Sequence, residues 1–323
     1  MPEISRKESA ILRVLGERDV PLGAAIIARE LKSHGIELTE RAVRYHLQAL
    51  DDIGLTESMG RVGRRLTEAG RSELANARVA DKVALAFARM EALAYHTAFD
   101  LAEGKGKIAL NVSLFRRGDF EAAMRVMRPV FRSRYATSDL FAVFEPGQRI
   151  ADQVVPRGMV GLGTVCSVTM NGILLSHGIP VHSEFGGLLE IAGYEPARFT
   201  EVVRYAGTSI DPVDVFIKGR ATSVGTAVST GRGKIGAGFR TFPAVARDHV
   251  ARLVEQMSAW RIHGVIAVGA ASRPLLEVEV DVGRAALVVC AGLNPVAAAE
   301  EAGYETASTA MATVFGYEDL VPA

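Results

Sequence analysis

Hydrophobic side chains recur at helical spacing in three segments at the beginning of the chain. In the first of them, Ile11, Leu12 and Leu15 form one apolar face, and Ser5 and Glu8 have the spacing of a capping box. Breaks that contain glycine or proline separate the three segments. The pattern therefore predicts helices that begin at Ser5, at about residue 24 and at residue 40.

The third of these helices has two chemically different faces. Val43, Leu47 and Leu50 form its apolar stripe, Thr39 is a favourable N-cap, and Gly54 stands where the helix should end. The opposite face carries side chains that can reach a base edge or a phosphate. They are Arg41, Arg44, Tyr45 and Gln48.

Two short strand-like runs follow, at 55–59 and 65–67, joined by a basic turn at 60–64. Three helices followed by a basic hairpin have the order of a winged helix-turn-helix, which we assign to residues 1–70. The alternative is an ordinary amphipathic helix with a charged hairpin after it. The predicted DNA-binding residues are Thr39, Arg41, Arg44, Tyr45 and Gln48 of the third helix and Arg61, Arg64 and Arg65 of the wing.

Residues 71–104 are assigned as a connecting and dimerisation helix, and the pattern predicts one long helix from Thr67 to about Phe99. Alternating steps of four and three along this helix resemble a coiled-coil seam, which favours a dimer; the alternative is a helix that packs on its own domain. The seam residues are Val83, Phe87, Met90, Ala94 and Thr97.

The remainder, 105–323, is predicted to be a mixed α/β ligand-binding domain with hairpins, which makes the whole chain α+β. The predicted strands are 107–115, 140–144, 188–191, 265–268, 275–280, 285–290 and 305–315. The predicted helices are 119–131, 196–205, 243–262 and 295–302. A hairpin is predicted around Asn171-Gly172, with strands at 164–170 and 173–176, and the runs 213–217 and 223–229 look extended. A weak internal repeat relates 119–176 to 243–290.

Composition limits the classes of partner. The chain has 323 residues and no net charge, so a DNA contact must come from a local basic patch such as the wing. Cys166 and Cys290 are the only cysteines, which excludes a disulfide framework and fits a reducing compartment. The sequence contains neither a signal-peptide pattern nor an apolar run long enough to cross a membrane. We therefore expect a cytoplasmic protein without a membrane partner.

Catalytic and cofactor motifs do not fit their surroundings. The glycines at 231–236 match a dinucleotide-binding pattern, but no helix begins directly after them, so we interpret the stretch as a flexible loop. His177 and His182 lack neighbouring cysteines and do not resemble a metal site. Cys166 is more typical of a buried thiol than of a nucleophile. We predict no enzyme activity, no cofactor and no metal.

Small polar residues cluster instead at predicted strand ends and turns. They occur at 166–171, 206–209, 236–240 and 292–295, and one of these clusters contains Arg240. Neutral donors together with one arginine are suited to binding a small anion. Ordinary turn chemistry is the alternative, since the same residue types dominate loops.

The chain resembles the nitrogen-regulatory repressor family NrpR over nearly its whole length. The blocks that carry the resemblance are NVSLF (111–115), CSVTMNGILL (166–175), GIPV (178–181), EFGGLLE (184–190), FTEVVRYAGTSIDP (199–212), GAGFR (236–240), GVIAVG (264–269) and GLNPVA (292–297). The resemblance implies a homodimeric repressor of nitrogen-assimilation genes that binds palindromic operator DNA. It also implies 2-oxoglutarate as the inducer. Some members have two copies of the ligand domain, whereas this chain has one.

The chemistry of 2-oxoglutarate suggests which of these polar residues bind it. Its two carboxylates and ketone can be held by one cation and several neutral donors, so we predict Arg240 as the carboxylate clamp. The predicted donors are Ser167, Thr169, Thr208 and Ser209, with Asn171 and Asn294 as further candidates. The long helix is the expected transmitter between ligand and DNA. Two alternatives stay open: a regulator of the same architecture that senses another metabolite, and an enzyme that carries a DNA-binding module.

Overall fold

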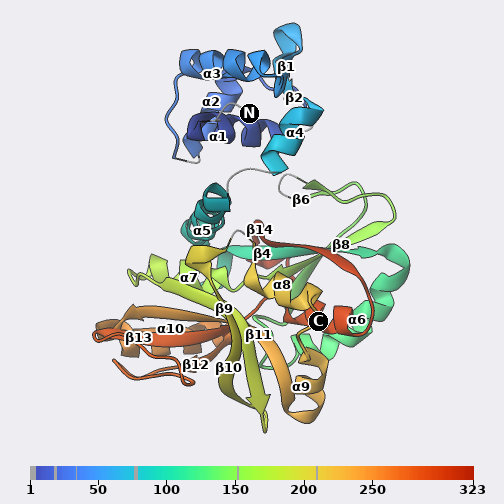
Figure 1. The fold of residues 1–323 in the computed structure, drawn as a ribbon. Helices are drawn as coiled ribbons and strands as arrows, with labels where there is room; N and C mark the ends of the chain where they lie inside the picture. Colours follow the sequence, from blue (N-terminus) through green and yellow to red (C-terminus); the bar gives the residue numbers. More distant parts are fainter. Residues whose placement is uncertain (1–4, 18–19, 34, 76–78, 151–152, 209) are drawn as a thin grey trace. The chain divides into compact units, whose positions relative to one another are not determined.

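The computed structural model describes residues 5–17, 20–33, 35–75, 79–150, 153–208 and 210–323, and the chain forms two compact units, 1–82 and 83–323. It confirms the predicted mixture of helices and sheets with a winged helix at the beginning (Figure 1). The elements of the N-terminal unit are α1 (Arg6–Gly16), α2 (Ala24–Ser33), α3 (Glu40–Asp52), β1 (Thr56–Ser58), η1 (Gly60–Val62), β2 (Arg64–Leu66) and α4 (Glu68–Ala75).

Capping residues at the helix ends and a buried apolar core stabilise the fold of the N-terminal unit. Ser5 and Glu8 form the predicted capping box of α1, and Thr39 accepts a hydrogen bond from the amide of Ala42 at the beginning of α3. The predicted stripe of α3 is fully buried against α1 and α2. The buried core consists of Ala10, Ile11, Leu12, Val14, Leu15, Leu22, Ile27, Leu31, Val43, Leu47, Leu50, Leu55 and Leu66.

The two strands of the wing pair with each other, and the wing also forms backbone hydrogen bonds to the loop before α2. Strands β1 and β2 pair antiparallel, and Arg64 also exchanges both backbone hydrogen bonds with Leu22. Gly63 has a φ of 127°, and a Cβ there would lie 2.3 Å from the carbonyl oxygen of Leu22. Glycine at this position therefore permits both the turn and the close approach.

The prediction of one long helix from Thr67 to Phe99 is wrong at its end. Helix α5 (Val79–His96) is followed by β3 (Ala98–Asp100), which contains Phe99, and residues 76–78 between α4 and α5 lie outside the described residues. Three residues of the predicted seam are not available to a second chain, because Met90, Ala94 and Thr97 are buried inside the C-terminal unit. The side chain of Val83 lies outside the described part. A coiled-coil dimer therefore cannot use this stripe from Met90 onwards.

The C-terminal unit contains two mixed layers of sheet and helix, built from two halves with the same order of elements. The first half is β4 (Lys105–Arg116), α6 (Arg117–Phe131), β5 (Leu140–Phe144), β8 (Met159–Val165), α7 (Val168–Ser176) and β9 (His182–Ala192). The second half is β11 (Arg232–Pro243), α10 (Arg247–Ala259), β12 (Val265–Val268), β13 (Arg284–Cys290), α11 (Asn294–Glu301) and β14 (Thr306–Gly316).

The two halves exchange their last strands. One sheet has the order β14-β4-β8-β5-β15 and the other β10-β9-β11-β13-β12, so β14 pairs with the first half and β9 with the second. Helices also pair across the halves: α6 shares a core with α11, and α7 shares one with α10. The elements outside this repeat are β6 (Arg149–Ile150), β7 (Gln153–Val154), β10 (Glu195–Arg204), η2 (Tyr205–Gly207), α8 (Pro212–Lys218), α9 (Val224–Thr230), η3 (Ala244–Ala246), η4 (Tyr317–Asp319) and β15 (Val321–Pro322).

Hydrogen bonds confirm that the halves are equivalent. The amide of Cys166 donates to the carbonyl of Ala109, and the amide of Ala291 donates to that of Gly236, both at 2.8 Å. The Thr169 hydroxyl bonds both backbone groups of Ala109, just as the Asn294 side chain bonds both of Gly236. The weak repeat in the sequence is therefore a pseudo-two-fold in the structure.

The hairpin predicted at Asn171-Gly172 is wrong, because these residues lie in the middle of α7. Residues 168–174 of this helix are all buried, so its sequence lacks the polar face that would have indicated a helix. A Cβ on Gly172 would lie 2.3 Å from the side chain of Thr97. Glycine is present because α7 approaches the end of α5 closely, and not because the chain turns.

Five further predictions fail because tertiary pairing or capping overrides the local sequence pattern. Residues predicted as a helix at 196–205 form the edge strand β10, which pairs antiparallel with β9. The runs predicted as extended at 213–217 and 223–229 are the helices α8 and α9. Gly231 is the C-cap of α9, and the glycines at 233 and 236 belong to strand β11 rather than to a flexible loop. Residues 275–280 form no strand, only a bridge between Leu275 and Val278.

Candidate effector cavity and DNA-binding surface

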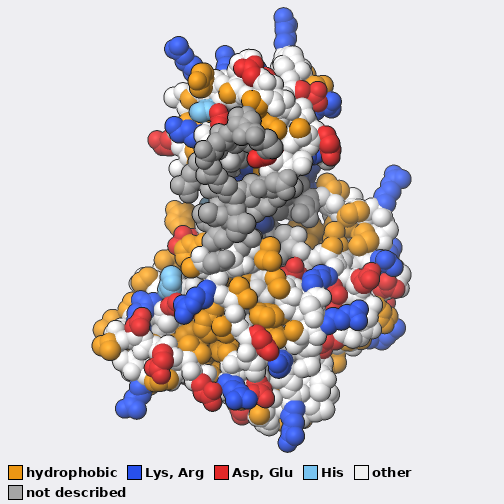
Figure 2. Space-filling model, viewed as in Figure 1, with side chains coloured by type: hydrophobic (Ala, Val, Ile, Leu, Met, Phe, Trp, Pro, Cys, Tyr) orange, Lys and Arg blue, Asp and Glu red, His pale blue; other side chains and the backbone are white. Residues whose placement is uncertain are grey.

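The outward face of α3 presents the predicted polar side chains to solvent. Arg41, Arg44, Tyr45 and Gln48 are all exposed, and Tyr45 retains 72% of its accessible surface. Figure 2 shows Lys and Arg side chains projecting from the surface of this unit, with acidic side chains among them. Thr39 is exposed too, but its hydroxyl already caps the helix.

The arginines of the wing differ in whether they form an ion pair with an acidic residue of the same unit. Arg64 is ion-paired with Asp51 at 2.6 Å, and Arg65 with Glu57 at 2.7 Å; on α3, Arg44 pairs with Glu40. Arg41 and Arg61 form no ion pair with any residue that the structure describes. Arg64 therefore holds the wing on α3, whereas Arg61 is the wing cation most available to a phosphate.

A small cavity of about 30 Å³ lies in the C-terminal unit between the two halves. Its walls contain equivalent positions from both halves, so the cavity lies on the pseudo-two-fold axis. These pairs are Asn111 and Gly238, Cys166 and Ala291, Ser167 and Gly292, and Val168 and Leu293. The remaining wall comes from Met90 on α5, from Tyr205, Asp211 and Val213, and from Ala310 and Met311 on β14.

Arg240 lies directly behind this wall. Its guanidinium donates to the backbone oxygen and to the hydroxyl of Ser167, both at 2.8 Å, and its Nε–H is buried without an acceptor. The side chain is only 1% exposed, and no Asp or Glu among the described residues pairs with it. Burial lowers the pKa of Arg240 from its ordinary value, but a guanidinium remains charged. An uncompensated buried cation is costly, and an anion at this place would relieve the cost.

The other predicted donors do not gather around Arg240. Thr169 bonds Ala109, and Asn294 donates to Gly236 and Tyr135 while accepting from Gly236. Thr169 therefore connects α7 to β4, and Asn294 makes the equivalent connection of α11 to β11 in the other half. These hydrogen bonds use both polar atoms of the Asn294 amide.

Asn171 and Thr208 are also engaged elsewhere. Asn171 donates to the hydroxyl of Ser183 at 3.2 Å, and its own oxygen is buried without a partner. Thr208 bonds the backbone of Ile210 within a turn. Ser209 lies outside the described residues. Of the predicted effector residues, the structure brings Ser167 and Arg240 together.

The cavity residues that were not predicted from the sequence include Met90, Asn111, Tyr205 and Asp211. A local signal existed for Asp211, because an Asp followed by Pro is typical of a helix N-terminus, and Asp211 does cap α8. Tyr205 and Asn111 carried no such signal, since strand pairing far along the chain brings them here.

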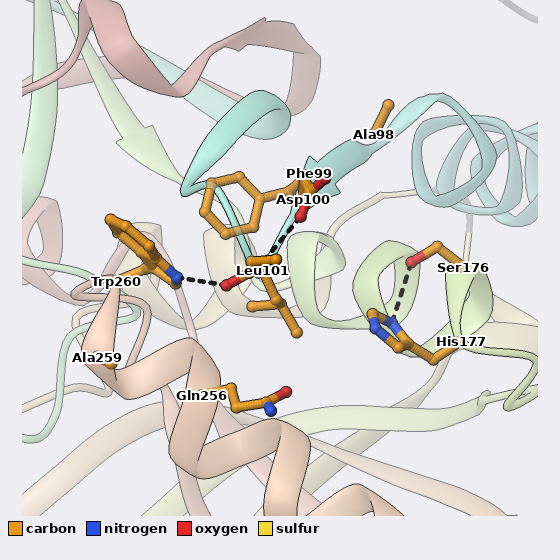
Figure 3. A pocket seen from close by; sticks show the side chains of 10 residues that line it. Ala98, Phe99, Asp100, Leu101, Ser176, His177, Gln256, Ala259 and Trp260 are labelled. Atoms are coloured by element: carbon orange, nitrogen blue, oxygen red, sulfur yellow. Dashed lines mark hydrogen bonds between the residues drawn. The ribbon is translucent and has the colours of Figure 1, made fainter.

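A larger open cleft of about 650 Å³ lies elsewhere in the same unit (Figure 3). Trp260 donates to the carbonyl of Leu101 at 2.7 Å and His177 faces the opening from the end of α7. The described residues that line it include the carboxylate of Asp100 but neither Lys nor Arg. It is therefore less suited to a dicarboxylate than the cavity next to Arg240, although it is larger.

Comparison with known proteins identifies the family. Residues 83–321 match the family described as NrpR regulatory domains NRD1 and 2, and residues 9–74 match the ribonuclease R winged-helix domain. The chain is 35% identical to the global nitrogen regulator NrpRI of Methanosarcina mazei, over 99% of this chain and 98% of that protein. The chain belongs to the NrpR family of nitrogen regulators. It is a nitrogen-regulatory repressor with a winged helix, and not an enzyme.

Other relatives of this NrpR-family chain are longer. The global nitrogen regulator NrpR of Methanococcus maripaludis is 30% identical over 94% of this chain, and that of Methanocaldococcus jannaschii is 28% identical over 99%. This chain spans only 52% and 55% of their lengths. The fold is similar to the crystal structure of a nitrogen repressor-like protein from Methanococcus jannaschii, with a TM-score of 0.62, 24% identity, and coverage of 73% of this chain and 97% of that one.

The described residues contain neither a membrane-spanning helix nor a metal-binding cluster. No helix among them combines the length and the apolar character needed to cross a membrane. Within the same residues, no three His, Cys, Asp or Glu side chains lie close enough to hold a metal ion. Both cysteines are free and buried, and burial raises the pKa of the Cys166 thiol to about 11.

Proposed function

We propose that this NrpR-family chain represses nitrogen-assimilation genes as a cytoplasmic homodimer on palindromic operator DNA, and that 2-oxoglutarate relieves the repression. The observation that carries the effector assignment is Arg240, a fully buried cation beside the cavity on the pseudo-two-fold axis. A carboxylate of 2-oxoglutarate would accept from its unused donors. The second carboxylate and the ketone would meet the neutral donors of Ser167 and Asn111.

The proposal requires the cavity to widen. Pockets that bury small ligands usually have volumes of about 300–1,000 Å³, whereas this one has about 30 Å³. A ligand that fits only a widened state shifts the population towards that state. Met90 forms part of the wall, and its helix α5 is the segment through which the chain continues to the winged helix. Displacement of α5 would therefore carry the signal from the ligand to the DNA-binding unit.

The test of the effector is a calorimetric titration of the full chain with 2-oxoglutarate, with glutamate and succinate as controls. Saturable binding of 2-oxoglutarate, tighter than of either control and with one site per chain, is expected because one cavity lies on the axis. Equal binding of succinate would show that the ketone is not recognised. Tighter binding of glutamate would favour the alternative of a regulator that senses an amino acid.

Arg61→Ala should weaken binding to operator and unrelated DNA alike. If this exposed arginine contacts a phosphate, its removal lowers the slope of log affinity against log salt by about one. Fluorescence anisotropy at several salt concentrations measures that slope. A loss confined to the operator sequence would instead place Arg61 at a base edge.

Arg64→Ala is the matched control for this experiment. Because Arg64 is paired with Asp51 and only partly exposed, its removal should affect the thermal stability of the winged helix more than the salt slope. A full unit of change in slope for Arg64→Ala would contradict the division of the wing arginines into one structural and one DNA-facing residue.

A further inference from the structure

The wall of the cavity beside Arg240 contains an acidic residue, Asp211, which is only partly exposed. Asp211 lines the cavity and begins α8, where its Oδ1 accepts hydrogen bonds from the amides of Val213 at 2.9 Å and Asp214 at 3.1 Å. Neither Arg240 nor any other Lys or Arg that the structure describes forms an ion pair with it. Its other carboxylate oxygen has no hydrogen-bond partner among the described residues.

The protonation state of Asp211 determines whether the cavity wall repels or attracts an anionic effector. A ligand carboxylate or ketone that enters the cavity brings oxygen atoms to a wall that holds an ionised carboxylate, and two like charges in a buried site repel strongly. The same wall becomes attractive when Asp211 is protonated, because a carboxylic acid has one O–H donor. Burial raises the pKa of Asp211, although the two amide hydrogen bonds oppose the shift.

We propose that Asp211 is a ligand-binding residue of this cavity and that it binds the effector as the neutral acid, through the oxygen that does not cap α8. In this arrangement Arg240 neutralises one carboxylate of the ligand, while Asp211 donates a hydrogen bond to a further ligand oxygen. The proton comes from solvent and remains on Asp211, so each bound effector is accompanied by up to one proton. The inference rests on the proposed binding of 2-oxoglutarate to this cavity.

The other ionisable groups around the cavity do not account for such a proton. Burial raises the pKa of both Tyr205 and Cys166, the latter to about 11, so both are neutral with and without ligand near pH 7. Arg240 stays charged. Asp214 lies next to Asp211 on α8 and burial raises its pKa as well, but it does not line the cavity, and it faces Lys218 and Glu300 instead.

The test is calorimetric titration with 2-oxoglutarate at one pH in two buffers of different ionisation enthalpy, repeated between about pH 6 and pH 9. The difference between buffers gives the number of protons bound. Uptake should approach one proton as the pH rises above the pKa of Asp211 in the free protein. In that range the affinity should fall by up to tenfold per pH unit. Both carboxylic acids of the ligand are already ionised there.

Asp211→Asn distinguishes this role from a structural one. Asparagine is an equally good N-cap, so α8 should keep its hydrogen bonds, and the amide N–H₂ replaces the acid O–H as a donor. This variant should bind 2-oxoglutarate without proton uptake and with an affinity that no longer depends on pH. Asp214→Asn is the matched control and should leave the uptake unchanged.

The outcomes separate the inference from the function on which it rests. Binding by the wild-type chain without proton uptake at any pH overturns the role of Asp211, and so does an uptake that persists in Asp211→Asn. Loss of binding in a folded Asp211→Asn protein would show that the ligand needs a charged partner there, which also overturns it. Failure of the wild-type chain to bind 2-oxoglutarate would instead contradict the proposed function.

Discussion

Arg240→Met should give a protein that is more stable than the wild type and that no longer binds 2-oxoglutarate. The guanidinium is 1% exposed, lacks a carboxylate partner among the described residues, and has a buried Nε–H without an acceptor. Its removal abolishes an unpaired buried charge, and methionine fills a similar volume. Replacement of buried ionic groups by apolar residues has stabilised other proteins by about 1–4 kcal/mol. Operator binding should persist, because the winged helix is unchanged.

Thermal denaturation tests the predicted gain in stability, and calorimetric titration tests the predicted loss of 2-oxoglutarate binding. Arg232→Met is the matched control, since Arg232 lies on the same strand but is exposed, and it should alter neither stability nor ligand binding appreciably. A strongly destabilised Arg240→Met would show that the bonds to Ser167 outweigh the cost of burying the charge. Retained affinity for 2-oxoglutarate would remove Arg240 from the effector site.

Asn294→Ala should destabilise the C-terminal unit by about 3 kcal/mol or more, without a direct effect on the ligand. Its side chain is fully buried and satisfies both backbone groups of Gly236 as well as the carbonyl of Tyr135. Alanine removes the partner of the Gly236 amide and of the Tyr135 carbonyl, while the Gly236 carbonyl keeps its hydrogen bond from the amide of Ala291. Each unsatisfied buried group costs about 1–3 kcal/mol.

Asn171→Ala is the control for this second prediction. Asn171 is also buried, but it makes one hydrogen bond, to Ser183, and its oxygen already lacks a partner. The expected loss is about 1 kcal/mol or less. Chemical denaturation monitored by circular dichroism compares the two variants. Similar losses, or a folded Asn294→Ala protein that has lost its affinity for 2-oxoglutarate, would restore Asn294 to the effector site.

Local physics explains why the winged helix was predictable. The capping box of α1, the N-cap Thr39 and the apolar stripe of α3 all act within a few residues, and the structure has each of them in place. From the sequence one could predict that Ser167 and Arg240 are the types of residue that bind an anion, but not that they contact each other. An arginine among small hydroxyls suggests an anion site, but no pattern in the chain states that residues 73 positions apart form a hydrogen bond.

The errors lie where distant residues determine the local conformation. Residues 168–174 of α7 are all buried and therefore show neither helical nor strand periodicity, so Asn171-Gly172 resembled a turn. Strand β10 is a strand because β9 pairs with it, although its own sequence pattern fits a helix equally well. Asp211 was the one missed cavity residue with a local signal, and that signal would have revealed α8 but not the cavity.

The exchange of β9 and β14 has a consequence for the kind of molecule that can be recognised. In an assembly of two identical chains, every residue near the axis occurs twice, and a buried guanidinium would face its own copy. Here the position equivalent to Arg240 is Ser113, since each is opposite a leucine on the neighbouring strand, Leu287 and Leu162 respectively. Because both halves belong to one polypeptide, natural selection could alter one without the other. The site can therefore tell one end of an asymmetric ligand from the other, which strict symmetry would forbid.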